Sequence, residues 1–304
     1  MSHTPSSADV QQEDILYEIC APHIARITLN HPETRNAQNT TLLYALNDAF
    51  DRAALDDAVK VIILAAHGPH FSAGHDLKEG ADDYEAMVAA TANFPTVGTW
   101  GGFAQPGAEG PFAREHEVYL GLCERWRNIP KPTIAQVQGK VIAGGLMLVW
   151  ACDIIVAADD AFFQDSTLNM GICGVEYFTH PQELSTRKAK EFLFTSDGID
   201  ADEALRIGMV NRVVPRVRLE EETLAMAKKI AGKSSFALKL TKEAINAAED
   251  ARGRKTAMQI AFAYHQLLST HWTWLTGLPA DPDFLRNARG GPTGGWTPRQ
   301  KPSN

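Results

Sequence analysis

Two short glycine-containing segments, each placed directly after a run of apolar residues, constrain this 304-residue chain more than any other feature. Residues 71–77 read FSAGHDL and follow the strand-like run 61–65, and residues 139–145 read GKVIAGG and follow the strand-like run 133–137. Because glycine has no side chain, main-chain N–H groups beside it can point into a site without obstruction. Two such groups that converge on one carbonyl oxygen form an oxyanion hole. The sequence therefore predicts a site built from backbone donors on two turns.

Strand-like and helix-like patterns alternate along the first two thirds of the chain. Short apolar or alternating runs at residues 24–29, 61–64, 133–137 and 154–158 are typical of strands. Between the first two runs, apolar side chains recur at helical spacing, and Asn39 or Thr40 can cap that helix; they are Leu42, Leu43, Leu46 and Phe50. The alternation predicts an α/β fold with parallel strand pairing.

Beyond Pro215 only helical patterns remain, at residues 219–231, 234–248 and 255–276. The sequence therefore predicts three parts, which are a polar disordered tail at residues 1–14, an α/β core at residues 15–215 and a helical C-terminal domain at residues 216–304. Residues 93–111 are rich in proline and glycine and have no clear period. Such a long loop is either a lid or disordered.

Composition excludes several classes of function. The net charge is −8 and no basic tract is present, so we expect no nucleic-acid partner. No apolar run reaches about 18 residues, and the N-terminus lacks the apolar stretch of a signal peptide, so we expect neither a membrane partner nor secretion. Cys20, Cys123, Cys152 and Cys173 lack the spacing of zinc ligands. We therefore expect reduced thiols, a cytoplasmic location and no metal.

Several segments together carry a resemblance to a known family. They are NHPETRNA at residues 30–37, the two glycine turns, CDI at residues 152–154, and a helix-to-strand unit at residues 201–214. In this order they resemble the crotonase, or enoyl-CoA hydratase/isomerase, superfamily. The resemblance implies a spiral of ββα units with a helical C-terminal domain that builds a homotrimer or a dimer of trimers. It also implies an acyl-CoA thioester as substrate, with no cofactor besides the coenzyme A of the substrate itself.

The same resemblance implies roles for individual residues. The oxyanion donors are the main-chain N–H groups of His75 and Gly144, and one such donor is typically worth about 2.7–4 kcal/mol. The His75 side chain then either lines the pocket or transfers a proton. Two facing segments are implied to bind coenzyme A, and their residues are Thr34, Arg35 and Ala37 on one side and Ala73, Asp76 and Leu77 on the other.

Two positions depart from the hydratase pattern. The resemblance implies one catalytic glutamate three residues after the oxyanion glycine and another in the segment after residue 154. This chain instead has Met147 and Thr167, which can line a pocket but cannot transfer protons as carboxylates do. Asp165 and Glu176 are alternative acids close by. One carboxyl that removes and returns a proton suffices for double-bond isomerisation, so the sequence favours isomerase-like chemistry and predicts poor classical hydration.

A non-catalytic function is the alternative, in which an oligomer has kept the acyl-CoA pocket and lost the acids. A Glu176 side chain that points into the pocket favours an enzyme, and one that faces solvent favours a binding protein. A second open choice concerns an apolar stripe in the last long helical pattern, which either contacts a partner or packs on the chain's own core. Its residues are Leu267, Leu268, Trp272 and Leu275.

Overall fold

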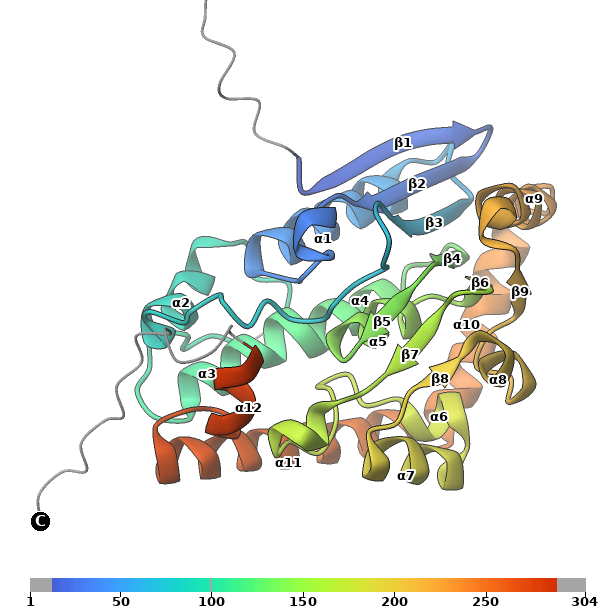
Figure 1. Cartoon of the computed structure of the whole chain (residues 1–304). Coiled ribbons are helices and arrows are strands. Elements are labelled where there is room, and N and C mark those ends of the chain that lie inside the picture. The colour runs from blue at the N-terminus through green and yellow to red at the C-terminus, as the bar shows by residue number, and fades with distance from the viewer. Residues whose placement is uncertain (1–12, 99, 289–304) are drawn as a thin grey trace, which may run out of the picture.

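A six-stranded sheet forms the centre of the molecule. The computed structural model describes residues 13–98 and 100–288 and orders these strands β1-β2-β3-β4-β6-β9 (Figure 1). β1 pairs antiparallel with β2, and every other neighbouring pair in this sheet is parallel. The strands are β1 Ile15–Ala21, β2 Ile24–Leu29, β3 Val61–Ala66, β4 Thr133–Val137, β6 Ile154–Ala158 and β9 Arg212–Val214. Parallel pairing along most of the sheet confirms the predicted α/β class.

A second, smaller sheet lies beside the first and gives the fold its spiral. Its order is β5-β7-β8, with β5 Lys140–Ile142 parallel to β7 Phe162–Gln164, and β8 Ile199–Asp200 antiparallel to β7. The chain passes from β4 to β5, and again from β6 to β7, through short turns. Each passage moves from the larger sheet to the smaller one before a helical segment follows, so the predicted ββα repeat is confirmed.

One helix matches its sequence pattern closely, and a second was not predicted. α1 Thr40–Leu55 begins after Asn39, whose Oδ1 accepts a hydrogen bond from the Leu42 N–H at 2.8 Å, so Asn39 rather than Thr40 is the cap. Its apolar stripe is buried in the main core. α5 Gly144–Trp150 is buried along its whole length, which explains why it shows no polar face in the sequence.

A long helix with a π-helical segment in its middle was not evident from the sequence. α3 Glu109–Glu115 continues without a break into the π-helical segment η3 His116–Gly121 and then into α4 Leu122–Arg127. α2 Tyr84–Ala90 and the 3-10 turn η2 Thr91–Asn93 precede it. Between η2 and α3, the described part of residues 94–108 has no regular secondary structure, although the Phe103 side chain is buried. A π-helical segment widens the helix locally and is frequent at functional sites.

The C-terminal helices do not form a separate core. α9 Leu219–Ala231 packs on the large sheet, where Leu219 and Ala227 are buried against Ile24 and Ile63. A boundary at residue 215 therefore does not divide two packing units. The other helices of this part are α10 Ser235–Ala251, α11 Arg254–Thr276 and α12 Pro282–Ala288, and α11 runs along the edge opposite β1 (Figure 1).

The remaining helical segments are short. They are α6 His180–Leu184, α7 Thr186–Thr195 and α8 Ala201–Arg206, with 3-10 turns at η1 Pro32–Thr34, η4 Thr167–Met170 and η5 Arg216–Arg218. Among the described helices, none combines the length and apolar character that a membrane crossing requires.

The apolar stripe of α11 was expected either to pack on the chain's own core or to contact a partner, and its residues fall into both groups. Leu268 and Trp272 pack in a small apolar cluster with Leu278 and Leu285, and the Trp272 indole N–H donates to the Gly171 carbonyl. Leu267 and Leu275 are exposed. One half of the stripe therefore packs on the chain's own core, and the other half is free to contact a partner.

The N-terminal tail is shorter than the sequence predicts, because Glu13 and Asp14 hold defined contacts. The Glu13 carbonyl accepts a hydrogen bond from the Asn30 side chain at 2.9 Å, and the Asp14 carbonyl accepts one from the Asn30 N–H at 2.9 Å. Residues 1–12 of the predicted tail lie outside the described residues.

Candidate functional site

The two glycine turns meet in space, as the sequence predicts. The Ile142 N–H donates to the Ser72 carbonyl at 3.0 Å, and an isolated bridge joins Ser72 to Val141. Gly74 has φ +89°, and a Cβ at this position would lie 2.7 Å from the Ile142 carbonyl oxygen and 3.1 Å from the Gly144 nitrogen. Only glycine fits there, because both the left-handed backbone and the close approach exclude a side chain.

Backbone geometry leaves two N–H groups free at this meeting point. Ala143 has φ +44° and ψ −112°, a strained conformation for a residue with a Cβ, and it sets the direction of the next peptide N–H. Within the described residues, no group accepts a hydrogen bond from the N–H of His75 or of Gly144. Orphan donors held on a strained turn are the expected form of an oxyanion hole.

The His75 imidazole lies between this turn and Glu176. Its Nε2 is 3.1 Å from Glu176 Oε2, and since a carboxylate only accepts, Nε2 donates. The ring stacks on Tyr119 with centroids 3.9 Å apart, and a Cβ added to Gly144 would lie 2.6 Å from its Cε1. His75 Nδ1 is buried and has no partner among the described groups. The side chain therefore lines the site rather than facing solvent.

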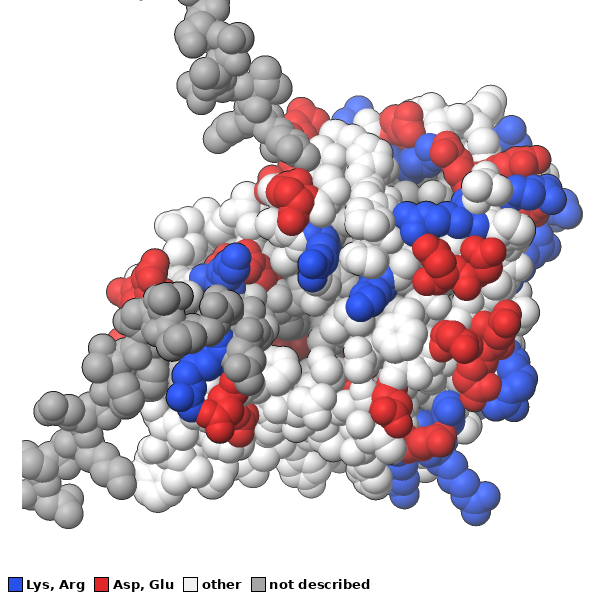
Figure 2. Space-filling model, viewed as in Figure 1, with Lys and Arg blue, Asp and Glu red and all other residues white. Residues whose placement is uncertain are grey.

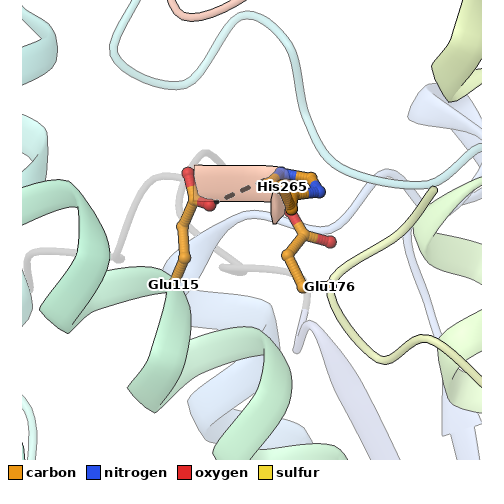
Figure 3. Close-up of side chains that lie close together, drawn as sticks. All are labelled: Glu115, Glu176 and His265. Atoms are coloured by element: carbon orange, nitrogen blue, oxygen red, sulfur yellow. Dashed lines mark ion pairs between the residues drawn. The ribbon is translucent and has the colours of Figure 1, made fainter. Parts of the chain in front are cut away.

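Glu176 belongs to a buried cluster that the sequence did not reveal in full. Figure 3 shows His265, from α11, lying between Glu115 at the end of α3 and Glu176 in the loop before α6. His265 Nε2 is 3.4 Å from Glu176 Oε1 and 3.6 Å from Glu115 Oε2. Its Nδ1 donates to the Gly174 carbonyl at 2.8 Å, and the Gln266 amide donates to Glu115 Oε2. All three members are at least nine-tenths buried.

The surroundings shift the pKa values of the two carboxyl groups of this cluster in opposite directions. Burial would raise the pKa of Glu176, but the positive charges of His75 and His265 outweigh it and lower that pKa below its usual range. Burial raises the pKa of Glu115, and the neighbouring Glu176 charge raises it further. Burial would lower the pKa of His265, and the charges of Glu176 and Glu115 outweigh it and raise it.

The same three side chains offer three metal-ligand atoms within 4.8 Å of one another. The His265 side chain lies beside both carboxyl groups, and burial raises the pKa of Glu115 while the pKa of His265 is raised by the two acids. The histidine can therefore take the place of a cation between the two acids.

Asp165 is also buried, but unlike those of Glu176, both of its carboxyl oxygens accept hydrogen bonds from neighbouring residues. Its Oδ1 accepts hydrogen bonds from the Thr167 N–H at 2.9 Å and the Thr167 hydroxyl at 2.6 Å. Its Oδ2 accepts from the Val175 N–H at 3.2 Å and from His180 Nε2 at 2.8 Å. Both oxygens are thus committed to holding the loop that carries Glu176, which favours a structural role for Asp165 over proton transfer.

The predicted coenzyme A segments lie side by side. The Ala73 N–H donates to the Arg35 carbonyl at 2.9 Å, and Arg35 itself is exposed with φ +58°. The positive charges of Lys140, Arg35 and Arg216 add to burial in lowering the pKa of His70, so basic side chains gather near this edge.

The other residues predicted for coenzyme A occupy the same two turns. Thr34 is exposed, Ala37 donates through its N–H to the Thr34 carbonyl, Asp76 caps the next turn by accepting from the Lys78 N–H, and Leu77 is half-buried.

Neither residue at the two positions that lack the expected glutamates carries a free polar group. Met147 is 1% exposed and packs within the main core. The Thr167 hydroxyl is spent on Asp165. Neither position offers a group that could exchange protons with a substrate.

Sequence reasoning missed Glu115, Tyr119 and His265. A weak signal exists for His265, which shares a buried helical face with Met258 and Phe262, so that a histidine interrupts an apolar stripe. Glu115 gives no comparable signal, because nothing in the sequence indicates the π-helical segment that follows it.

Comparison with known proteins agrees with the motifs. A family model described as Enoyl-CoA hydratase/isomerase matches residues 21–100 and 107–272. A protein of Mycobacterium tuberculosis named as the enoyl-CoA hydratase EchA13 is 45% identical over 267 residues, which cover 87% of this chain and 83% of that protein.

Solved structures agree as well. One from Mycobacterium thermoresistibile, named as an enoyl-CoA hydratase, has a TM-score of 0.76 at 45% identity and covers 86% of this chain and 99% of its own. An enoyl-CoA hydratase/isomerase from Xanthobacter autotrophicus Py2 has a TM-score of 0.74 at 31% identity, covering 92% of this chain and 94% of that one. The crotonase-type spiral expected from the motifs is confirmed.

Proposed function

This chain belongs to the enoyl-CoA hydratase/isomerase family, and from that premise we propose that it moves a proton along the carbon chain of an acyl-CoA thioester through an enolate. One observation carries the proposal, namely the convergence of two free backbone N–H groups, at His75 and Gly144, with the buried carboxylate of Glu176. The His75 ring links the two, since it packs over Gly144 and donates to Glu176.

The backbone donors stabilise the charge that the reaction creates. When a base removes a proton from the α-carbon of a thioester, negative charge moves to the carbonyl oxygen. Two N–H groups already aimed at that oxygen stabilise the enolate by about 2.7–4 kcal/mol each. The strain at Ala143 supports this role, because it holds the Gly144 N–H in place before the substrate arrives.

Glu176 is the group we assign to proton transfer. Its lowered pKa keeps it anionic at neutral pH, and its burial excludes competing water. The same histidine charges that lower this pKa also make it a weaker base, so the oxyanion hole must supply much of the driving force. One carboxylate that takes a proton from the α-carbon and returns it at the γ-carbon completes a double-bond isomerisation, which is the reaction we favour.

Coenzyme A is assigned to the edge formed by the two facing turns. Arg35 is exposed there, among the basic side chains that influence His70, and can meet a phosphate. The four cysteines are all free thiols, which supports a reducing, cytoplasmic location.

A homo-oligomer, either a trimer or a dimer of trimers, is part of the proposal. Large apolar side chains are exposed on α10 and α11, and they include Phe236, Ile245, Tyr264, Leu267 and Trp274. Figure 2 shows few charged side chains along the lower edge, where α11 lies. Apolar surface of this extent is typical of a face that contacts another subunit.

The alternative of a non-catalytic binding protein predicts a Glu176 that faces solvent. Its side chain is instead 5% exposed and bonded to His75. The geometry therefore favours an enzyme, although Met147 and Thr167 replace the family's usual acids.

Deuterium exchange tests the proposal directly. The protein is incubated in D2O with butyryl-CoA, which has an α-proton but no double bond, and α-deuterium is measured by mass spectrometry. We expect exchange in the wild type and a loss of about 10²–10⁴-fold in Glu176→Gln. Glu191→Gln, which alters an exposed glutamate of α7, is the matched control. Absence of exchange in the wild type, at concentrations where butyryl-CoA binds by calorimetry, would support the binding protein instead.

A further inference from the structure

A single imidazole nitrogen faces two buried carboxyl groups in this site. His265 Nε2 lies 3.4 Å from Glu176 Oε1 and 3.6 Å from Glu115 Oε2, and the three atoms all lie within 4.8 Å of one another. The other ring nitrogen is held by the Gly174 carbonyl at 2.8 Å, so the ring presents only Nε2 to both acids. Any proton that passes between the two carboxyl groups through the protein therefore passes through one atom.

We propose that Glu115 is a second proton-transfer carboxyl of this site, and that with Glu176 it allows water to be added to, or removed from, the β-carbon of an enoyl thioester. The proposal rests on the proposed function, because it uses the same oxyanion hole and the same Glu176. It replaces the two glutamates expected at Met147 and Thr167 by a pair drawn from α3 and from the loop before α6.

The spacing of the two acids suits one water molecule. Two hydrogen bonds of about 2.8 Å that meet at a tetrahedral oxygen span about 4.6 Å. The carboxyl oxygens of Glu115 and Glu176 lie within 4.8 Å of each other, so both can contact the same water. The π-helical segment that begins at His116 sets where α3 ends, and so places the Glu115 side chain toward the cluster.

The pKa values of the two acids are shifted in opposite directions, which suits them to opposite roles. The lowered pKa of Glu176 favours it as the base and the raised pKa of Glu115 favours it as the acid, and His265 Nε2 lies within 3.6 Å of both. Two carboxyl groups whose surroundings separate their pKa values are the usual acid and base of such a reaction.

The atoms balance over one turnover. In the direction of water removal, Glu176 takes the α-proton of a 3-hydroxyacyl thioester, and the electron pair of that C–H bond moves to the thioester oxygen in the oxyanion hole. As the carbonyl re-forms, the double bond forms between the α- and β-carbons, the bond from the β-carbon to oxygen breaks, and the leaving hydroxyl takes the proton of Glu115 and departs as water. His265 Nε2 gives its proton to Glu115 and receives the one on Glu176, which restores the starting state with no oxidant or metal. Hydration is the reverse of these steps.

Other ionisable groups also face this cluster and interact electrostatically with its members. They are Tyr84 on α2, Arg114 on α3, Tyr119 on η3, Cys123 on α4, His75 after β3, and Asp165 and Cys173 on the loop beside Glu176. Burial raises the pKa of Tyr119 to about 12, so it stays neutral at working pH.

Two assays on the same variants distinguish the role of Glu115 from that of Glu176. Hydration of crotonyl-CoA is followed by loss of enoyl absorbance, and α-proton exchange of butyryl-CoA by mass spectrometry. We expect Glu115→Gln to lose at least about 100-fold in hydration but at least about tenfold less than that in exchange, because exchange needs no acid at the β-oxygen. Glu176→Gln should lose both. Glu115→Asp, which keeps the acid on a shorter side chain, should recover part of the hydration.

The outcomes that overturn the proposal are distinct. Exchange and isomerisation without hydration in the wild type would remove the role of Glu115 and leave the proposed function intact. Equal hydration by the wild type and a folded Glu115→Gln would do the same. Absence of exchange would overturn both proposals together. A stoichiometric metal in the purified protein, with activity lost to a chelator, would assign the cluster to metal binding instead.

His265 acts through the two acids and is a positioning residue, so its test is the pH profile. Its positive charge lowers the pKa of both Glu176 and Glu115. In His265→Gln both pKa values rise, and both limbs of the hydration profile should move to higher pH. A reduced rate with an unshifted profile would show that the histidine only supports the fold.

Discussion

Two buried carboxylate–histidine clusters lie near each other in this protein, and they differ in how fully their polar atoms are used. Asp165 accepts four hydrogen bonds at 2.6–3.2 Å from Thr167, Val175 and His180. Glu115 and Glu176 instead lie 3.6 and 3.4 Å from His265 Nε2, which is longer than an ordinary hydrogen bond. Both oxygens of Asp165 are thus committed, although His180 Nδ1 has no partner among the described groups. Glu176 and Glu115 accept hydrogen bonds from His75 and Gln266, respectively, and contact His265 only at the longer distance.

The difference separates a structural role from a reactive one. A buried carboxylate with every lone pair satisfied gains stability from its contacts and has nothing left to offer a substrate. A buried cluster with long, incomplete contacts is less stabilising, and its protons can move. Sequence position alone does not show this, because Asp165 and Glu176 lie in the same segment after β7.

The largest effect is expected from removing the charge of Asp165, whose two oxygens hold Thr167, Val175 and His180. Asp165→Asn should lower the free energy of unfolding by about 3–5 kcal/mol, because it leaves His180 and the donors of Thr167 and Val175 without their buried anion. Thr167→Val, which removes one donor only, should cost about 1.5–3 kcal/mol. Urea unfolding followed by circular dichroism measures both. If Asp165→Asn unfolds like the wild type yet loses hydration, Asp165 is catalytic.

The second prediction tests the proposed oxyanion hole independently of the two carboxylate–histidine clusters. Gly144→Pro removes one N–H donor at a position that contacts no carboxylate, and α-proton exchange should fall by about 100-fold or more. Stability should change less than in Asp165→Asn. Gly144→Ala is the control, because it keeps the N–H and adds a Cβ that in either variant would lie 2.6 Å from His75 Cε1. Unchanged exchange in folded Gly144→Pro protein would exclude this N–H as a donor.

The sequence predicts the locally determined parts of the structure well. The glycine turns, the strands at residues 133–137 and 154–158 and the Asn39 cap depend on local chemistry, since left-handed backbone, β-branched runs and caps each have a short-range signature. The meeting of the two glycine turns follows from the same local features.

The reactive cluster could not be predicted, because its members come from segments that meet only after folding. Glu115 and His265 lie on α3 and α11, and the apolar stripe of α11 indicates that His265 is buried, but nothing in the sequence indicates that Glu115 faces it. The packing of α9 on the large sheet could not be predicted for a similar reason, since α9 looks like any amphipathic helix until its partner sheet is known.

The third prediction uses pH to contrast the two clusters. Burial opposes the lowered pKa of Asp165, and the His180 hydrogen bond outweighs it. A lowered folded-state pKa gives stability that is present above the unfolded value of about 3.9 and is lost as pH falls through the folded value. Glu115, whose pKa burial raises, has the opposite sign: its stability is complete below about 4.3 and is lost as pH rises.

Unfolding free energies measured from pH 3 upward test this contrast. The deficit of Asp165→Asn relative to the wild type should shrink as pH falls below about 4. Glu115→Gln should gain on the wild type as pH rises above about 4.3, because the amide has no proton to lose. Parallel curves for the two variants would mean that both acids are held in the same charge state.

The smallest expected effect concerns the contact that connects the oxyanion turn to the reactive cluster. Tyr119 stacks on the His75 ring at 3.9 Å, and such a pair is worth about 0.5–1.5 kcal/mol beyond its buried area. If the stack holds His75 between Gly144 and Glu176, Tyr119→Leu should slow α-proton exchange roughly two- to tenfold. Tyr119→Phe keeps the ring and loses only the hydroxyl that accepts from Arg114 at 3.2 Å, so it should lower stability by about 1 kcal/mol and exchange by less than Tyr119→Leu. Equal losses of exchange in the two variants would mean that the hydroxyl, rather than the stacked ring, controls the position of His75.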